Sequence, residues 1–300
     1  MSVSVCTLAH GRERHLANLV EGLRQSDTMP DELIVAVMQN DRYNLGETPF
    51  PVRQIVLGDA DIPLARARNT AARAATGDLL VFLDVDCIAA PGLISDYVAA
   101  ADELDGVLMG EVAYLPKGAA SRGVDYDRFE SVGVQHSDRP GPPDSGWRAC
   151  EDYRCFWSLN FALTAQLFER IGGFDPRFVG YGGEDTDFGR TIAENGHELW
   201  WVRGAKAYHQ YHPHHMPPVH HLDSVLANAM VFCDKWGEPT MQHWLRAFVL
   251  MGLLERGENG WRKLREPDKR DFALTRQQED EPYASSAVVL EWLEAKGRAA

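Results

Sequence analysis

The sequence predicts an α/β fold, a mostly parallel central sheet flanked by helices, with a helical extension at the C-terminus. The first half alternates short apolar runs with helix-like segments, as in chains that build parallel strands with crossover helices. The run Leu79–Leu83 is apolar throughout, as expected of a central strand covered on both faces. The 300 residues suffice for one large α/β domain or two small ones.

The elements of the first half follow in order. Ser2–Leu8 is rich in β-branched residues and predicts the first strand. Glu13–Gln25 carries apolar residues at helical spacing and predicts the first helix. Pro63 and Gly77 enclose an alanine-rich helix, with proline at its start and glycine past its end. The remaining elements expected in this half are strands at Leu33–Met38, Gln54–Leu57, Leu79–Leu83 and Val107–Leu115, and a helix at Pro91–Leu104.

The second half begins with Lys117–Gly146, whose glycine, proline, serine and charge predict an exposed, mobile loop that could serve as a lid. Glu255–Pro282 is heavily charged, and we expect it to be loosely held. Val288–Leu293 predicts a terminal helix that either packs back or joins a partner chain in a homodimer. The other elements expected here are a strand at Phe156–Leu163, a helix at Thr164–Ile171, a turn at Gly172–Pro176, a helix at Glu184–Glu194, a strand through Trp200–Val202, and helices at Leu222–Trp236 and Met241–Leu254.

Charge and cysteine content exclude several classes of protein. Thirty Lys and Arg against forty-four Asp and Glu leave a net charge of −14. This charge repels polyanions, so we expect no nucleic-acid partner, and a phosphate ligand would need a local basic site or a metal. The five cysteines are odd in number and unevenly spaced, which favours a reducing compartment. Because no stretch approaches the roughly 20 apolar residues of a membrane span, we expect no transmembrane segment and a cytoplasmic location.

Asp84-Val85-Asp86 directly follows the central strand, at the sheet edge where open α/β folds bind ligands. Two carboxylates in these positions can address one ligand and supply the oxygen donors that a hard divalent cation prefers. The alternative is a pair of solvated turn carboxylates, and the tripeptide by itself leaves both open.

A second acidic motif, Gly180-Tyr-Gly-Gly-Glu-Asp-Thr-Asp187, combines glycines with carboxylates. The glycines let the backbone pass close to a ligand, and the acids lie in the first turn of a predicted helix, where the helix dipole favours them. They are either helix-start acids or a functional group. A carboxylate beside a sugar pocket can act as general base towards an acceptor hydroxyl.

Six of the eleven histidines lie within residues 209–221. A neutral imidazole at His209 would complete an oxygen and nitrogen shell for Mn²⁺ beside the aspartates. A zinc site of two or three histidines is the competing functional interpretation, and a solvated polar loop is the structural one. For His212, His214 and His215 we favour the solvated loop.

These blocks together resemble the family 2 glycosyltransferases of the GT-A fold. The resemblance rests on Leu83–Asp86, on Gly172-Gly-Phe-Asp-Pro followed by the Gly180–Asp187 motif, and on Ala207-Tyr-His-Gln, in this order. The Gly180–Asp187 motif resembles one shared by galactosyltransferases and bacterial chondroitin polymerases. The similarity runs from about Ser2 to about Gln210. It implies a nucleotide-sugar-dependent domain over residues 1–221, with a donor half at about 1–115 and an acceptor half at about 150–221, and a helical extension over 222–300.

The resemblance also implies roles for individual residues. Asp86 and His209 would bind a Mn²⁺ or Mg²⁺ ion that holds the donor diphosphate, with Asp84 nearer the ribose or sugar. Asp185 would be the catalytic base, and Glu184 would contact donor or acceptor hydroxyls. The other implied donor or acceptor contacts are Thr7, Ala9 and Arg12 at the uracil and ribose, Arg68 at the nucleotide, Trp157, Asn160 and Tyr181 around the sugar, and Gly183. Many family members place an aspartate against the uracil after the second strand, whereas this chain has Gln39-Asn-Asp41, so either Gln39 or Asp41 takes that place.

The expected activity is transfer of a sugar of the galactose or N-acetylhexosamine type from a UDP-sugar to an acceptor hydroxyl, with inversion. Three alternatives remain. The first is a retaining enzyme similar to the N-acetylgalactosaminyltransferases, which usually carry Asn where this chain has Asp185. The second is a non-catalytic nucleotide-sugar binding module. The third is a zinc hydrolase built on the histidines.

Overall fold

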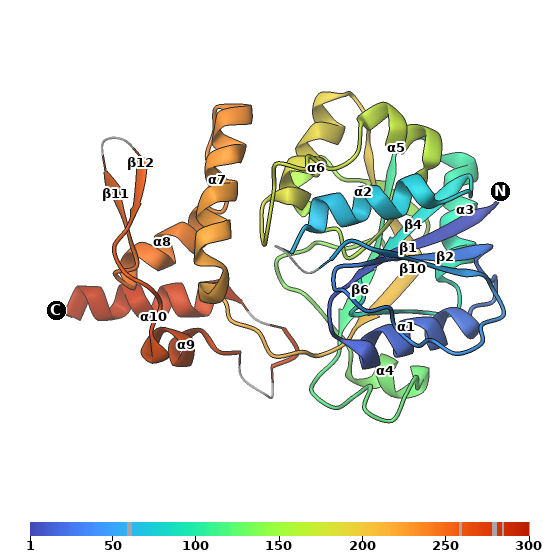
Figure 1. The fold of residues 1–300 in the computed structure, drawn as a ribbon, viewed down its shortest axis with the longest axis horizontal. Helices are drawn as coiled ribbons and strands as arrows, with labels where there is room; N and C mark the ends of the chain where they lie inside the picture. Colours follow the sequence, from blue (N-terminus) through green and yellow to red (C-terminus); the bar gives the residue numbers. More distant parts are fainter. Residues whose placement is uncertain (59–61, 258–259, 278–280, 284, 300) are drawn as a thin grey trace.

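A single large sheet organises the first 221 residues of the computed structural model, which describes residues 1–58, 62–257, 260–277, 281–283 and 285–299 (Figure 1). The sheet order is β3 (Val52–Val56), β2 (Glu32–Val37), β1 (Val3–Ala9), β4 (Leu79–Leu83), β9 (Asn160–Thr164), β6 (Val107–Tyr114), β10 (Leu199–His209) and β5 (Cys87–Ala89). Two short strands extend it, with β7 (Val134–Gln135) on β6 and β8 (Trp147–Ala149) on β10.

Most strands of the sheet point the same way. β1 is parallel to β2 and β4, β2 is parallel to β3, and β10 is parallel to β6. β9 is antiparallel to both β4 and β6, and β5 is antiparallel to β10. The carboxyl ends of β1, β2, β4, β6 and β10 therefore meet at one edge, together with the amino end of β9.

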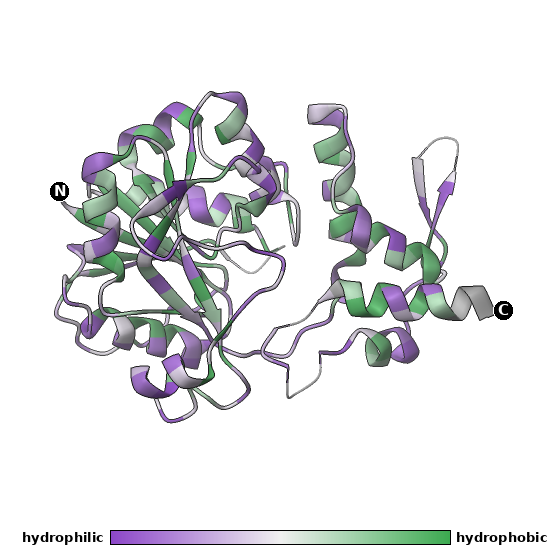
Figure 2. Cartoon of the chain, turned by 180° about the vertical axis from the view of Figure 1, so that it is seen from behind, coloured by the Kyte–Doolittle hydropathy of each residue, from purple (hydrophilic) through white to green (hydrophobic). Residues whose placement is uncertain are grey.

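Helices cover both faces of this sheet, as the sequence predicts. Apolar residues of α1 (Glu13–Arg24) and α3 (Leu93–Glu103) pack in one core on one face. Those of α2 (Leu64–Ala74), α5 (Ala165–Ile171) and α6 (Glu184–Glu194) form the core on the other face. The strands between them are mostly hydrophobic (Figure 2). The predicted α/β class with a mostly parallel central sheet is confirmed.

Residues 117–146 are more ordered than the expected loop. They contain α4 (Tyr126–Val132), whose N-terminus is capped by Asp125 accepting a hydrogen bond from the Arg128 amide. Phe129 of this helix is fully buried among apolar residues. The helix is too short for its amphipathic pattern to stand out against the surrounding glycines and prolines, so the prediction of an exposed loop was wrong for this helix.

The C-terminal residues form a second body beside the sheet domain (Figure 1). After the short helix η2 (Val219–His221) they comprise α7 (Leu222–Trp236), α8 (Gln242–Leu250), the hairpin β11 (Leu254–Gly257) and β12 (Gly260–Lys263), α9 (Lys269–Thr275) and α10 (Ser286–Ala299). These elements share an apolar core that includes Val225, Leu245 and Phe248. We call residues 222–299 the C-terminal extension.

Two expectations about the extension can be compared with the structure. The charged segment 255–282 contains the hairpin and α9, whose start is fixed by a capping box between Asp268 and Asp271, so it is not simply loose. Residues 258–259 and 278–280 of that segment lie outside the described residues. The terminal helix packs on α8, where Arg246 and Glu294 form an ion pair at 2.8 Å. No helix in the described part of the chain combines the length and apolar character needed to cross a bilayer.

Candidate active site

The three predicted motifs converge at the carboxyl edge of the sheet. Asp84 and Asp86 follow β4, and His209 is the last residue of β10. The Asp84 amide donates to the Leu159 carbonyl at 2.9 Å, which joins this edge to the segment before β9. α6 begins at Glu184, directly after the glycines of the Gly180–Asp187 motif. The Glu184 carboxylate accepts a hydrogen bond from Arg68 of α2. The three motifs, which are far apart in the sequence, therefore lie together at one candidate site.

Asp86, His209 and His212 form a group that could hold a metal ion. Their ligand atoms all lie within 4.8 Å of one another. Backbone bonds fix the group, because the Gln210 amide donates to the Asp86 carbonyl at 2.6 Å and His209 pairs with Cys87 of β5. The Asp86 Oδ2 atom is 3.4 Å from His212 Nε2. Two of these residues were expected from the sequence, and His212 was not.

Sequence reasoning assigned His212 to a solvated loop, and the structure corrects that assignment. The side chain is mostly buried, with its ring 5.4 Å from that of His209 and 4.7 Å from that of His214. The chain leaves β10 at His209 and turns back, so residue 212 returns to the site at a spacing that no strand or helix period predicts. The available signal was only the density of histidines in residues 209–221.

The chemistry of this group suits a divalent transition metal. Burial lowers the pKa of His209 to about 3 and that of His212 to about 2, so both imidazoles are neutral at neutral pH. Neutral imidazole is the form that binds metals. His209 Nδ1 is buried and has no hydrogen-bond partner among the described residues. One carboxylate with two neutral imidazoles is a ligand set that fits Mn²⁺ and related ions.

Arg12 lies directly on this group. Its Nη1 atom is 2.6 Å from Asp86 Oδ1, and its backbone is left-handed with a φ of 53° at the start of α1. The sequence predicts Arg12 at the uracil and ribose, and the structure places its guanidinium against the carboxylate of Asp86, a predicted metal ligand. A cation at the site would share Asp86 with this side chain.

A second group of charges surrounds Arg68, which is only 4% exposed. Its Nη1 atom is 3.2 Å from Glu184 Oε1, and its positive charge opposes the rise in pKa of Asp84, Glu184 and Asp185. Burial dominates nonetheless, raising the pKa of Asp84 to about 6 and that of Glu184 to about 7. The structure gives Arg68 a role inside the protein, holding Glu184, and its contact with the nucleotide stays a prediction.

Asp185 is the predicted general base. It lies in the first turn of α6, and backbone amides at Thr186 and Ser158 donate to its carboxylate. Burial raises its pKa above the ordinary aspartate range. A carboxylate with a raised pKa is a stronger base than a solvated aspartate.

Two donor-site expectations disagree with the structure. Asn160 is fully buried, donating from Nδ2 to the Ala205 and Glu111 carbonyls and accepting from the Tyr97 hydroxyl. Its amide atoms serve the packing of β9 against its neighbours, so it does not line a sugar pocket. Thr7 and Ala9, the last residue of β1, are 1% and 0% exposed, so their side chains do not face a nucleotide.

The remaining predicted residues lie around the same edge. Gln39 accepts hydrogen bonds from the Gly11 amide at 2.8 Å and the Tyr43 hydroxyl at 3.0 Å, whereas Asp41 is exposed. Trp157 packs edge-on against His136. Gly183 caps the start of α6 with a φ of 89°. Tyr181 stacks between the rings of His221 and Trp244, with centroids 4.7 and 5.8 Å away.

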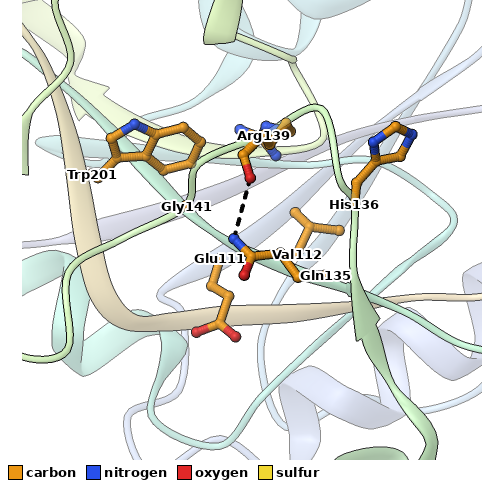
Figure 3. Close-up of a pocket in the computed structure, with 7 residues that line it drawn as sticks. All are labelled: Glu111, Val112, Gln135, His136, Arg139, Gly141 and Trp201. Carbon is orange, nitrogen blue, oxygen red and sulfur yellow. Dashed lines mark hydrogen bonds between the residues drawn. The ribbon is translucent and has the colours of Figure 1, made fainter.

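A small pocket adjoins this edge, because its lining residues His136 and Arg139 pack against Trp157 (Figure 3). Figure 3 shows a hydrogen bond between two of the pocket's lining residues, in which Gln135 Nε2 donates to the Arg139 carbonyl. The two atoms are 3.4 Å apart. The pocket lining contains none of the predicted metal or catalytic residues, so we do not place the active site there. The lining residues are Glu111, Val112, Gln135, His136, Arg139, Gly141 and Trp201.

Comparison with known families covers both halves of the sheet domain. Residues 4–124 match the profile described as "Glycosyl transferase family 2", and residues 145–215 match that described as "N-terminal domain of galactosyltransferase". The fold is the GT-A fold of these glycosyltransferases, and its sheet edge carries the carboxylates of the predicted motifs. The two matches support the assignment to family 2 of the glycosyltransferases that the motifs predict.

Individual relatives are distant. The chain is 26% identical over 266 residues to validoxylamine A glucosyltransferase of Streptomyces hygroscopicus subsp. limoneus, covering 78% of this chain and 56% of the relative. It is 22% identical over 243 residues to the chondroitin synthase of Escherichia coli, covering 70% of this chain and 35% of that protein. The chain thus spans about half the length, or less, of these curated relatives.

Solved structures show the same fold. A structure of GalNAc-T7 with UDP, GalNAc and Mn²⁺ superposes with a TM-score of 0.54 at 18% identity, covering 70% of this chain and 43% of that one. Residues 1–349 of S. aureus TarS in complex with UDP-GlcNAc give a TM-score of 0.53 at 16% identity, covering 71% of this chain and 59% of that one. At these identities the likeness concerns the fold.

Proposed function

We propose that the protein transfers a sugar, of the galactose or N-acetylhexosamine type, from a UDP-sugar to an acceptor hydroxyl with inversion, using a bound Mn²⁺ or Mg²⁺. The observation that carries this proposal is the presence at one sheet edge of a metal-type group, Asp86, His209 and His212, and a separate base-type carboxylate, Asp185. The structural neighbours solved with UDP, GalNAc and Mn²⁺, and with UDP-GlcNAc, support the class of donor.

The charges at the site support separate roles for the metal-type group and for Asp185. A divalent cation bound by Asp86, His209 and His212 would offset the negative charge that develops on the leaving diphosphate. Asp185 accepts the proton of the attacking hydroxyl while the anomeric carbon inverts. Glu184, held by Arg68, contacts donor or acceptor hydroxyls. An aspartate at position 185 supports inversion over the retaining alternative. The proposed donor and acceptor contacts are Arg12, Gln39, Asp84, Trp157, Tyr181 and Gly183.

The test of the base is Asp185→Asn. We expect transfer to fall by about 10² to 10⁴, the usual contribution of general base catalysis, because the amide cannot take the proton. Binding of UDP with Mn²⁺, measured by calorimetry, should remain close to that of the wild type. The matched control is Asp127→Asn, the same chemical change in the first turn of α4 at an exposed position, which should leave both unchanged.

Other outcomes separate the alternatives. Loss of UDP binding together with transfer in Asp185→Asn would remove Asp185 from the role of base. A product with the donor's anomeric configuration, read from proton NMR couplings, would favour the retaining enzyme. Binding of UDP-sugars without UDP release over an acceptor panel would indicate the non-catalytic module. Zinc in the purified protein with hydrolysis that survives Asp86→Ala would favour the hydrolase.

A further inference from the structure

The glycine motif of the active site is packed against the C-terminal extension. A Cβ atom at Gly180 would lie 2.5 Å from Ser224 Cβ, and one at Gly182 would lie 3.0 Å from Met241 Sδ. Both glycines have left-handed backbones, with φ of 77° and 93°. The sequence suggests that these glycines make room for a ligand. In the structure the close neighbours of these two are side chains of the extension.

Asn228 of α7 holds the motif by its backbone. Its Oδ1 atom accepts from the Val179 amide at 3.2 Å, and its Nδ2 atom donates to the Val179 carbonyl at 3.1 Å and to the Gly182 carbonyl at 2.7 Å. One helical turn earlier, Ser224 Oγ accepts from the Tyr181 amide at 3.2 Å. Asn228 is 2% exposed. Among uncharged side chains of this size, only an amide both donates and accepts in this way.

The far end of α7 holds the residue just beyond the base. Lys235 Nζ lies 2.8 Å from a carboxylate oxygen of Asp187, and Trp236 Nε1 donates to the same carboxylate at 2.7 Å. Asp187 is 1% exposed. The backbone carrying Asp185 is therefore anchored on both sides, at Gly182 by Asn228 and at Asp187 by the end of α7.

We propose that Asn228 is a positioning residue for glycosyl transfer, and that α7 makes the C-terminal extension an integral part of the active site. Asn228 touches neither the base nor the metal-type group through any contact in the described structure. It acts through the backbone of Val179–Gly183, which sets the direction of Tyr181 and the first turn of α6. The expected loss of kcat, the catalytic consequence, rests on the proposed function of Asp185. The expected loosening of the Val179–Gly183 backbone, the structural consequence, does not.

The experiment compares Asn228→Ala and Asn228→Asp with Leu253→Ala. The aspartate keeps the shape and the acceptor but sets a carboxylate against the Val179 and Gly182 carbonyls. Leu253 is fully buried in the core of the extension and makes no hydrogen bond to the motif, so its truncation destabilises the extension without releasing the motif. Two quantities are measured, namely kcat and KM for the UDP-sugar, and hydrogen exchange of the amides of residues 179–183.

Both Asn228 variants should lower kcat by roughly tenfold or more, with a smaller change in KM, because small displacements of catalytic groups are costly. The Val179 and Tyr181 amides should exchange faster by about tenfold or more, as expected when a local hydrogen-bonded unit opens. Exchange in β1 and β4 should not change. Leu253→Ala should lower the melting temperature with kcat and the motif's exchange close to wild type.

Wild-type kcat in a folded Asn228 variant, or an equal loss of kcat in Leu253→Ala, would overturn the catalytic consequence. Unchanged hydrogen exchange of the amides of residues 179–183 in the Asn228 variants would overturn the structural consequence, that Asn228 holds this backbone. Should Asn228→Ala fail to fold, Asn228→Asp and Ser224→Ala provide the same comparison. A wild-type protein that transfers no sugar would refute the proposed function, and the exchange measurement would still decide whether Asn228 positions the motif.

Discussion

Burial acts in opposite directions on the two kinds of titratable residue at the site. It lowers the pKa of His209 to about 3, because the charged imidazolium loses its hydration. It raises the pKa of Glu184 to about 7, because the carboxylate loses hydration in the same way and lies beside Asp185. The site thereby combines neutral imidazoles in the metal-type group with a carboxyl group, Glu184, whose burial favours the protonated form.

At the residue scale, His212 provides the sharpest test of the metal group. His212→Ala removes one of the imidazoles that lie within 4.8 Å of the other ligand atoms. We expect Mn²⁺ affinity, measured by calorimetry or electron paramagnetic resonance without nucleotide, to fall by about tenfold or more, since even residues that only support ligands have effects of this size.

The control for this substitution is His220→Ala. His220 belongs to the same run of histidines but is exposed and lies outside the metal-type group. Its removal should leave Mn²⁺ affinity unchanged. Equal affinities in wild type and His212→Ala would restrict the ligands to Asp86 and His209, as the sequence predicts.

At the element scale, short strands and close helix contacts decide how the motifs meet. β5 has only three residues, yet it pairs with the end of β10 and places Cys87 opposite His209. The sequence did not reveal this strand, because three residues are too few for a periodic pattern. α1 packs directly on β5, and the contact requires glycine at position 22.

Gly22→Ala tests this packing. The added Cβ would lie 2.8 Å from Ile88 Cγ2 and 3.2 Å from the Ala89 amide nitrogen. Alanine improves helix propensity by about 1 kcal/mol, but overpacking costs about 1–3 kcal/mol, so we expect a net loss of stability. Urea denaturation measures the change in free energy of unfolding.

The exposed position 17 of the same helix supplies the control. Ala17→Gly removes helix propensity without touching β5 and should cost about 1 kcal/mol. A more stable Gly22→Ala protein would mean that α1 and β5 can separate without penalty, contrary to the structure.

At the scale of the whole molecule, the net charge of −14 and a diphosphate ligand are compatible if a cation mediates between them. Part of the acidic excess lies at the site itself, in Asp84, Asp86, Glu184 and Asp185. Arg12 and Arg68 supply basic groups beside these acids, each paired with one of them. Binding of the nucleotide should therefore depend on metal.

A thermal-shift panel of UDP-, GDP- and dTDP-sugars with and without Mn²⁺ tests this dependence. A ligand at about 100 times its Kd stabilises the folded protein by about 2.7 kcal/mol, which corresponds to a rise in Tm of roughly 4 °C for a chain of this size. We expect this rise only for UDP-sugars with Mn²⁺, and EDTA should reverse it. An equal rise without metal would contradict the proposed role of Asp86 and the histidines.

The sequence by itself determined the α/β class, most strands and helices, the order of the motifs and the family. These properties follow from local periodicity and from the chemistry of side chains that are close in sequence, and both can be read from the sequence. Asp84, Asp86, Asp185 and His209 lie at one sheet edge, and the roles expected of them stay predictions.

Only the tertiary structure decided which distant residues meet. His212 joins the metal-type group, Arg68 reaches Glu184 across 116 positions, and Asn228 reaches Gly182 across 46. The structure also shows that Asn160 is buried and does not line a sugar pocket, and that Gly180 and Gly182 pack closely against the C-terminal extension. Hydrogen bonds and desolvation depend on neighbours in space, and no sequence period encodes them. The extension therefore becomes part of the site only when the chain is folded.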